Sequence, residues 1–104
     1  TYHRIIGAVL LYLTIGHIFV GFYGLAALFV PHAFSGLDLV EGPRLISDLT
    51  YFSFVTLTST GYGDIVPVQP LARSLCNIEA IIGQLFPATL LARLVTLELE
   101  DRRR

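Results

Sequence analysis

The stretch TLTSTGYGD, from Thr56 to Asp64, decides how this chain folds. It is polar and rich in glycine, yet strongly apolar segments lie before and after it. In a soluble protein such a stretch would be a surface turn. Within a membrane, non-helical backbone is tolerated only where it is buried in protein or lines a water-filled space. The fold therefore depends on whether the flanking segments belong in a membrane.

The composition favours lipid as the solvent of much of the surface. The chain has 104 residues, of which 54% are apolar and 14% are charged. A soluble domain carries about 25% charged residues, so this chain has too few polar side chains to cover its exterior. Its net charge of −1 provides no field that would attract nucleic acid. The single cysteine, Cys76, excludes an internal disulfide.

The apolar flanks have the lengths of membrane helices. Residues 5–30 form a run of 26 without Asp, Glu, Lys or Arg. As a helix this run would be about 39 Å long, which is enough to cross a hydrocarbon layer of about 30 Å with some tilt. Residues 71–97 are less apolar and include Glu79 and Arg93, which is typical of a helix that lines a wet interior. We expect two transmembrane helices.

Between these helices lie two shorter segments. Residues 31–44 contain prolines and glycines and are predicted to be an extracellular loop. Residues 45–58 are too few to span a bilayer as a helix, which needs about 20, so they fit a short helix that enters the membrane and stops. Ser47 or Asp48 could cap its start. A β-strand is the alternative, because Thr, Val, Phe and Tyr favour strands.

Residues 58–64, TSTGYGD, resemble the selectivity filter of potassium channels, in which rings of backbone carbonyls replace the hydration shell of the ion. The resemblance extends over about residues 5–95. It implies an all-α membrane protein, with two transmembrane helices flanking a re-entrant pore helix (45–58) and an extended selectivity filter (59–64). It further implies a single pore domain over residues 1–104 and a homotetrameric channel.

The resemblance also implies roles for individual residues. Potassium ions, bound in the filter and transported, would be coordinated mainly by backbone carbonyls of Ser59, Thr60, Gly61 and Tyr62. Support for the filter would come from Gly63, Asp64 and Tyr51, with a hydrogen bond from the Tyr51 hydroxyl to Asp64. The gating-hinge glycine of the family falls on Gly83. The other residues expected to take part in gating and to line the inner pore follow from the sequence itself, because they share one helix face: Gln84, Pro87, Leu91 and Val95. No organic cofactor is implied.

Two residues depart from the usual family sequence. Ser59 replaces a threonine, so it keeps the hydroxyl but loses the methyl that restricts its rotamer, and Thr60 replaces Val or Ile. We expect potassium-selective passive conduction, gated by bending of the inner helix at Gly83 and Pro87. The alternative is a nonselective monovalent cation channel on the same scaffold. Close packing at Gly83 with a static kink at Pro87 is the alternative to a hinge.

An enzyme is not expected. The glycines at 61 and 63 do not continue into a dinucleotide-binding pattern, because position 66 is Val66, and the chain has no lysine for a phosphate loop. Its three histidines are scattered along the chain.

The arginines predict the orientation. Arg4, Arg93 and the run 102–104 fall at the end shared by the two helices, which places both termini in the cytoplasm. We expect an integral membrane protein of a bacterial plasma membrane, surrounded by lipid and without a nucleic-acid partner. Because the first residue is Thr, we expect the chain to be a processed or excised piece, so sensor or regulatory domains could lie outside it.

Glu79 is the residue that the resemblance explains least. A carboxylate within a membrane helix is costly unless it is paired or protonated. It could bond to hydroxyls behind the pore helix, at Ser53 or Thr56. The alternative is a charge in the cavity that attracts cations.

Overall fold

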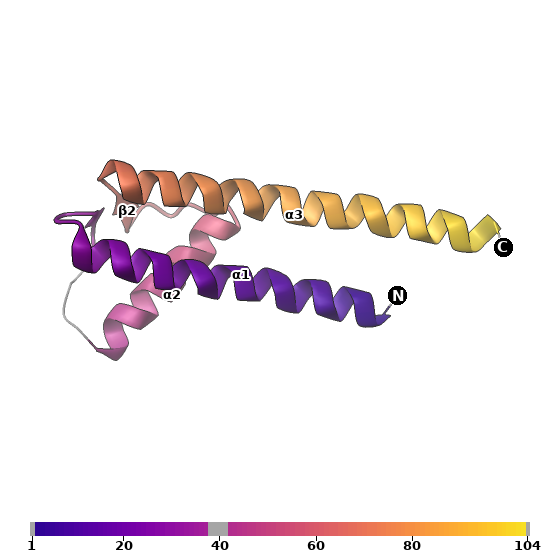
Figure 1. The fold of residues 1–104 in the computed structure, drawn as a ribbon, viewed down its shortest axis with the longest axis horizontal. Coiled ribbons are helices and arrows are strands. Elements are labelled where there is room, and N and C mark those ends of the chain that lie inside the picture. Colours follow the sequence, from indigo (N-terminus) through magenta and orange to yellow (C-terminus); the bar gives the residue numbers. More distant parts are fainter. Residues whose placement is uncertain (1, 38–41, 104) are drawn as a thin grey trace.

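The computed structural model describes residues 2–37 and 42–103. Its main elements are the helices α1 (Tyr2–Phe29), α2 (Pro43–Leu57) and α3 (Pro70–Arg103). The helices α1 and α3 run in opposite directions side by side, and α2 lies across them (Figure 1). Both ends of the chain therefore lie at the same end of the molecule. Residues 38–41 of the predicted loop, Thr1 and Arg104 lie outside the described residues.

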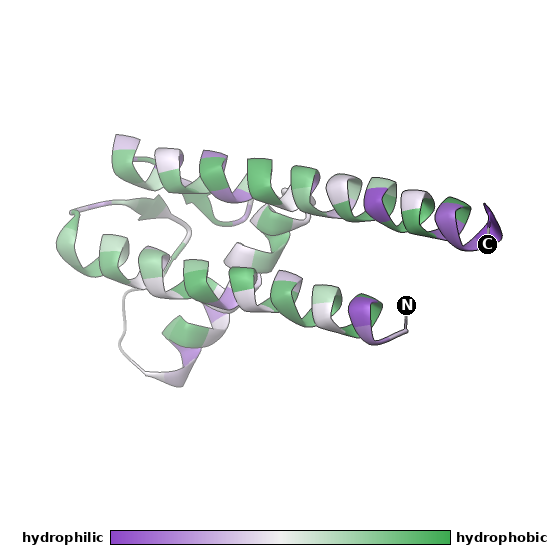
Figure 2. Ribbon diagram, turned by 45° about the vertical axis from the view of Figure 1, so that its right-hand side comes forward, coloured by the Kyte–Doolittle hydropathy of each residue, from purple (hydrophilic) through white to green (hydrophobic). Residues whose placement is uncertain are grey.

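The two long helices match the predicted membrane spans. Both α1 and α3 are long and apolar enough to cross a membrane, and apolar residues recur along both in Figure 2. Hydrophilic residues lie at the end that holds the two termini. α3 begins at Pro70 and continues to Arg103, beyond the predicted end at residue 97. The predicted class, an all-α membrane protein with two membrane helices, is confirmed.

The short segment between them is a helix, so the strand alternative for residues 45–58 is wrong. α2 begins at Pro43, where the fixed φ of proline suits the first helical position and its missing N–H is not needed. Gly42 is the N-cap residue, and no side chain caps the helix. The predicted caps, Ser47 and Asp48, lie inside the helix instead. Helical packing here overrides the strand preference of Thr, Val, Phe and Tyr.

A pair of strands that the sequence analysis did not predict joins the two loops. β1 (Phe34–Ser35) pairs antiparallel with β2 (Val66–Pro67). The Val68 N–H extends this contact by donating to the Ala33 carbonyl at 2.8 Å. Gly36, at φ 86°, lies so close to the Asp64 carbonyl oxygen that a Cβ would overlap it. The segment after Gly63 is therefore held against the loop that follows α1.

The buried core lies where the three helices meet. Aromatic rings of α1, α2 and β1 pack at 5.1–5.8 Å between centroids, with Tyr23 in contact with Phe34 and Phe52. Leu49 and Cys76 complete the cluster from α2 and α3. The remaining apolar side chains of α1 and α3 are mostly exposed. This small core fixes α2, and α2 leads directly into the Gly-rich segment.

Candidate functional site

The Gly-rich segment, residues 59–64, follows the last turn of α2 and is neither helix nor strand. The sign of the backbone angle φ alternates from one residue to the next. It is positive at Ser59 (58°), Gly61 (62°) and Gly63 (87°), whereas Thr60 and Tyr62 do not have positive φ. In a regular strand successive carbonyls point to opposite sides. A backbone in which the sign of φ alternates can instead turn successive carbonyls to one side. Glycine adopts positive φ without a steric penalty.

The hydrogen bonds of this segment leave its carbonyls free. The N–H groups of Thr60 and Gly61 both donate to the Val55 carbonyl, at 2.9 and 3.4 Å. The Ser59 N–H donates to the Thr56 carbonyl at 3.0 Å. Among the described residues, no hydrogen bond ends on the carbonyls of residues 59–62. The end of α2 thus accepts from the N–H groups of residues 59–61, while the carbonyls of residues 59–62 lie on an exposed surface.

Side chains tie the two unusual residues, Ser59 and Thr60, to the flanking helices. Gln84 Nε2 on α3 donates to Ser59 Oγ at 3.0 Å. Thr58 and Thr60 hydroxyl oxygens lie 2.8 Å apart, and Thr58 uses its proton on the Phe54 carbonyl at 2.7 Å. Thr60 must therefore donate to Thr58. A valine at position 60 could not make this contact.

Tyr51 lies beside the segment. Its ring stacks on that of Tyr62 at 6.1 Å between centroids. Partial burial, and then the hydroxyl's proximity to Asp64, raise the pKa of Tyr51. Asp64 Oδ1 accepts a bond of 3.1 Å from the Ile65 N–H, and no Tyr51–Asp64 bond of ordinary geometry is formed among the described residues. The predicted bond stays a prediction.

Glu79 of α3 is completely buried, together with Ser53 of α2 and Tyr23 of α1. Tyr23 of α1 donates to Glu79 Oε1 at 2.7 Å, and Ser53 Oγ lies 2.7 Å from Glu79 Oε2. The Ser53 contact is the one predicted. Thr56 does not take part, because its hydroxyl bonds to the Phe52 carbonyl at 2.9 Å. Glu79 faces the interface of the three helices, so it is not an exposed cavity charge in this chain.

Gly83 packs against the end of α2. A Cβ at Gly83 would overlap the carbonyl oxygen of Leu57, the last residue of that helix. Tyr12 of α1 reaches the same place, with its hydroxyl 3.4 Å from both the Leu57 and the Gly83 carbonyl. Pro87 has no N–H to offer the Gly83 carbonyl four residues earlier, and α3 continues through it. Close packing at Gly83 is thus observed.

The other predicted inner-pore residues share an exposed face of α3. Their spacing of three or four residues places them one above another along the helix. They are Gln84, Pro87, Leu91 and Val95, all exposed in this chain.

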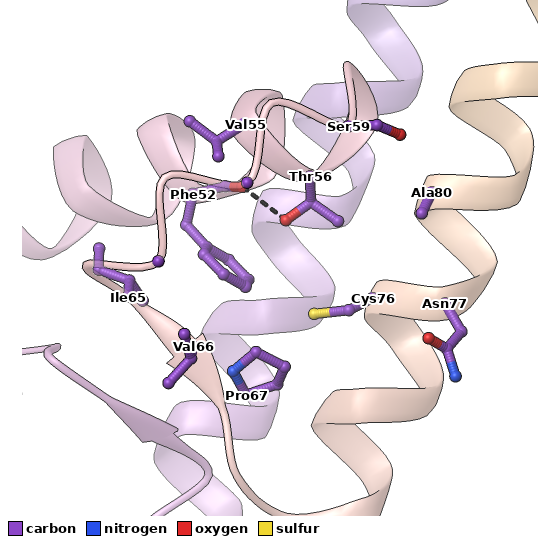
Figure 3. A pocket seen from close by; sticks show the side chains of 12 residues that line it. Phe52, Val55, Thr56, Ser59, Ile65, Val66, Pro67, Cys76, Asn77 and Ala80 are labelled. Atoms are coloured by element: carbon purple, nitrogen blue, oxygen red, sulfur yellow. Dashed lines mark hydrogen bonds between the residues drawn. The ribbon is translucent and has the colours of Figure 1, made fainter.

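A cavity of about 350 Å³ separates the Gly-rich segment from α3. Figure 3 shows its lining by Thr56 and Ser59 on one side and by Cys76, Asn77 and Ala80 on the other. No role was predicted for Asn77 or Cys76. Their spacing of three and four residues from Ala80 was the available signal, since it places them on one helix face.

The chemistry that this arrangement supports is coordination of a cation by oxygen. Backbone carbonyls and a hydroxyl are the ligands that hard cations prefer. Within residues 2–37 and 42–103, no cluster of three or more His, Cys, Asp or Glu side chains could hold a metal ion.

Comparisons with known proteins relate the chain to ion channels. A family model described as "Ion channel" matches residues 5–99. The chain is 38% identical over 50 residues to the inward rectifier potassium channel Kirbac3.1 of Paramagnetospirillum magnetotacticum, a match that covers 46% of this chain and 17% of the relative. It is 39% identical over 51 residues to the protein LctB of Bacillus caldotenax and to that of Geobacillus stearothermophilus, covering 49% of this chain and 37% of each relative. The matches thus span well under half the length of these relatives.

Proposed function

The chain belongs to the ion-channel family, and from this we propose that it forms the potassium-selective pore of a homotetrameric channel. In the proposed assembly each chain contributes the carbonyls of Ser59, Thr60, Gly61 and Tyr62 to rings around a central axis. The chain spans less than half the length of the relatives compared, so the activity concerns the pore and leaves any further domains aside. The family comprises channels rather than enzymes.

One observation carries this proposal: the sign of φ alternates along residues 59–63, and the carbonyls of residues 59–62 accept no hydrogen bond from any described residue. Unpaired carbonyls at membrane depth cost several kcal/mol each (about 2–7 kcal/mol for an amide). A row of potassium ions without their hydration shell would satisfy these carbonyls. The relative Kirbac3.1 is named as a potassium channel, and this supports potassium as the ion that the proposed pore conducts.

The surrounding residues support a filter held in place from three sides. Gly63 and Asp64 connect the filter to the β1–β2 contact through Gly36. Tyr51 stacks on Tyr62, and Gln84 bonds to Ser59. The C-terminal end of α2, which carries partial negative charge, would face a cation waiting below the filter.

For the inner pore we propose that Gln84 faces the cavity and that Leu91 and Val95 narrow the inner mouth. Opening would bend α3 near Gly83 and Pro87, because Pro87 removes one helix hydrogen bond there. The packing of Gly83 on Leu57 means that this bend would involve the part of α3 after Gly83. The N-terminal end of α1 and the C-terminal end of α3, which carry Arg4, Arg93 and Arg102, would lie in the cytoplasm. The bacterial relatives favour a bacterial plasma membrane.

The second candidate is a nonselective cation channel on the same scaffold. Ser59 and Thr60 favour it, since they replace the residues usual in selective filters. The two candidates differ in one measurable quantity, the reversal potential in mixed potassium and sodium.

Reconstitution into liposomes with a potassium gradient tests the proposal. We expect a potassium flux that barium blocks and that Gly61→Ala abolishes. Within one chain a Cβ at Gly61 meets no atom within 4 Å, so among the contacts of a single subunit this substitution disturbs only the backbone conformation at φ 62°. Gly7→Ala, also in open space but within α1, is the matched control and should conduct normally. Equal sodium and potassium fluxes would contradict selectivity, and an absence of flux would contradict the function.

A further inference from the structure

Glu79 takes part in a chain of short contacts that crosses all three helices. From α1, the Tyr23 hydroxyl lies 2.7 Å from Glu79 Oε1. Glu79 Oε2 on α3 lies 2.7 Å from Ser53 Oγ on α2. Ser53 Oγ in turn lies 2.6 Å from the Gly16 carbonyl on α1. These distances are those of hydrogen bonds between oxygens.

The three contacts of this chain require three protons, one for each pair of oxygens. Tyr23 and Ser53 supply one each, and the Gly16 carbonyl supplies none. Ser53 has a single proton and cannot donate both to Gly16 and to Glu79. With an ionised Glu79, one of the two Ser53 contacts would bring lone pairs together with no proton between them.

We infer that Glu79 is protonated and acts as the positioning residue that fixes the pore helix between the two membrane helices. Its proton lies on Oε2 and is donated to Ser53, which then donates to the Gly16 carbonyl, while Tyr23 donates to Oε1. Every donor and acceptor of the chain is satisfied in this arrangement. Its role in the pore rests on the proposed function; the assignment of the proton does not.

The surroundings agree with a neutral carboxyl. Glu79, Ser53 and Tyr23 have no exposed surface of consequence, at 0% each. Within residues 2–37 and 42–103, Glu79 forms no ion pair. The other titratable groups near it are the hydroxyls of Tyr12 and Tyr23 and the thiol of Cys76, and none is a cation. An ionised carboxylate buried without a cation is far more costly than a neutral acid.

The consequence for the pore follows from the position of Ser53. It lies one helical turn before Thr56, whose carbonyl accepts from the Ser59 N–H. Loss of the Glu79 contact frees α2 to rotate or tilt, and the Gly-rich segment moves with it. A glutamine replaces the protonated acid atom for atom, with its carbonyl facing Tyr23 and its amide donating to Ser53. A leucine leaves both hydroxyls without this partner.

Infrared difference spectroscopy of the reconstituted protein at neutral pH tests the proton directly. The spectrum of the unmodified chain minus that of Glu79→Gln should show the carbonyl stretch of a protonated carboxylic acid. Glu98→Gln is the matched control: Glu98 is exposed and pairs with Arg102 at 3.5 Å, so its difference spectrum should show an ionised carboxylate. A carboxylate band for Glu79 as well would overturn the inference.

Assembly and flux test the positioning role. Glu79→Gln should retain the oligomer and at least half of the potassium flux. Glu79→Leu removes both hydrogen bonds of the carboxyl group and should lose at least nine-tenths of the flux. Loss of flux in Glu79→Gln, or normal flux in Glu79→Leu, would overturn the role. An acid band without potassium flux in any variant would leave the proton assigned and contradict the proposed function instead.

Discussion

Gln84 and Ser59 join α3 to the first residue of the Gly-rich segment through a hydrogen bond of 3.0 Å. Ser59 has a positive φ of 58°, and it lacks the methyl group that would restrict its side chain. The amide of Gln84 therefore holds a hydroxyl that is otherwise free to rotate. In the proposed channel this hydroxyl belongs to the innermost ion site.

Replacing Gln84 should lower potassium selectivity. Gln84→Leu removes the donor, and a bond of about 0.5–1.5 kcal/mol corresponds to a fall of about 2- to 12-fold in the potassium-to-sodium permeability ratio. Reversal potentials in mixed ions measure this ratio. Gln69→Leu is the control, because the N–H of Gln69 donates to the Ala33 carbonyl in the loop after α1, and it should leave the ratio unchanged. The effects of Gln84→Leu and Ser59→Ala should not add in the double variant, and additive effects would contradict a direct contact.

Gly83 should not tolerate a side chain. In Gly83→Ala the new Cβ overlaps the Leu57 carbonyl oxygen, which is backbone and cannot move aside easily. Overpacking costs about 1–3 kcal/mol, so the proposed oligomer should dissociate at a lower temperature in detergent. Gly21→Ala, a glycine of α1 with nothing within 4 Å of its Cβ, should be neutral or stabilising. Equal stability of the two variants would show that close packing at Gly83 is unimportant.

Tyr12 should contribute more to the stability of the protein when Pro87 is present. The hydroxyl of Tyr12 is a long-range partner, at 3.4 Å, for the Gly83 carbonyl that Pro87 leaves without a helix donor. Tyr12→Phe should therefore destabilise the protein by about 0.5 kcal/mol, the lower end for a hydrogen bond. In a Pro87→Ala background the alanine N–H replaces this donor, and the cost should shrink. Tyr2→Phe, at an exposed position, is the control; a cost that is independent of Pro87 would argue against the coupling.

The pH at which the Tyr51 phenol ionises should depend on Asp64. Partial burial, followed by Asp64, raises the pKa of the Tyr51 phenol above its ordinary value of about 10. The stability from this neutral phenol is present below about pH 10 and is lost as pH rises through the raised pKa. Absorbance titration of the phenolate, with Tyr51→Phe to identify its signal, measures the shift.

In the same titration, Asp64→Asn removes the negative charge, so Tyr51 should ionise at lower pH. Asp48→Asn, on the same helix, should leave the curve unchanged. An identical curve for Asp64→Asn would show that the two side chains do not interact.

The large elements of the fold could be predicted because they depend on hydropathy and length. The run 5–30 had to be a helix, since a membrane leaves few alternatives for 26 apolar residues. The strand pair at Phe34 and Val66 could not be predicted, because two-residue strands have no periodicity. The start of α2 was misjudged: Pro43 at the first helical position was a signal that the polar residues Ser47 and Asp48 obscured.

The site was predictable in parts. The motif identified the Gly-rich segment, and the burial cost of a carboxylate led to the Ser53 partner of Glu79. The partners on α1 were missed, although Tyr12 and Tyr23 are eleven residues apart, about three helical turns, and so lie on one face of an otherwise apolar helix. The roles of Gln84 and Thr60 depended on side-chain geometry that spacing alone does not determine.

The carbonyls of residues 59–62, which accept no hydrogen bond from any described residue, also constrain how the protein is made. A single chain released into a bilayer would carry these groups on its surface, where hydrocarbon offers them no partner. A single subunit would then be unstable in the membrane. In the proposed channel, a chain would therefore have to associate with the others as it inserts.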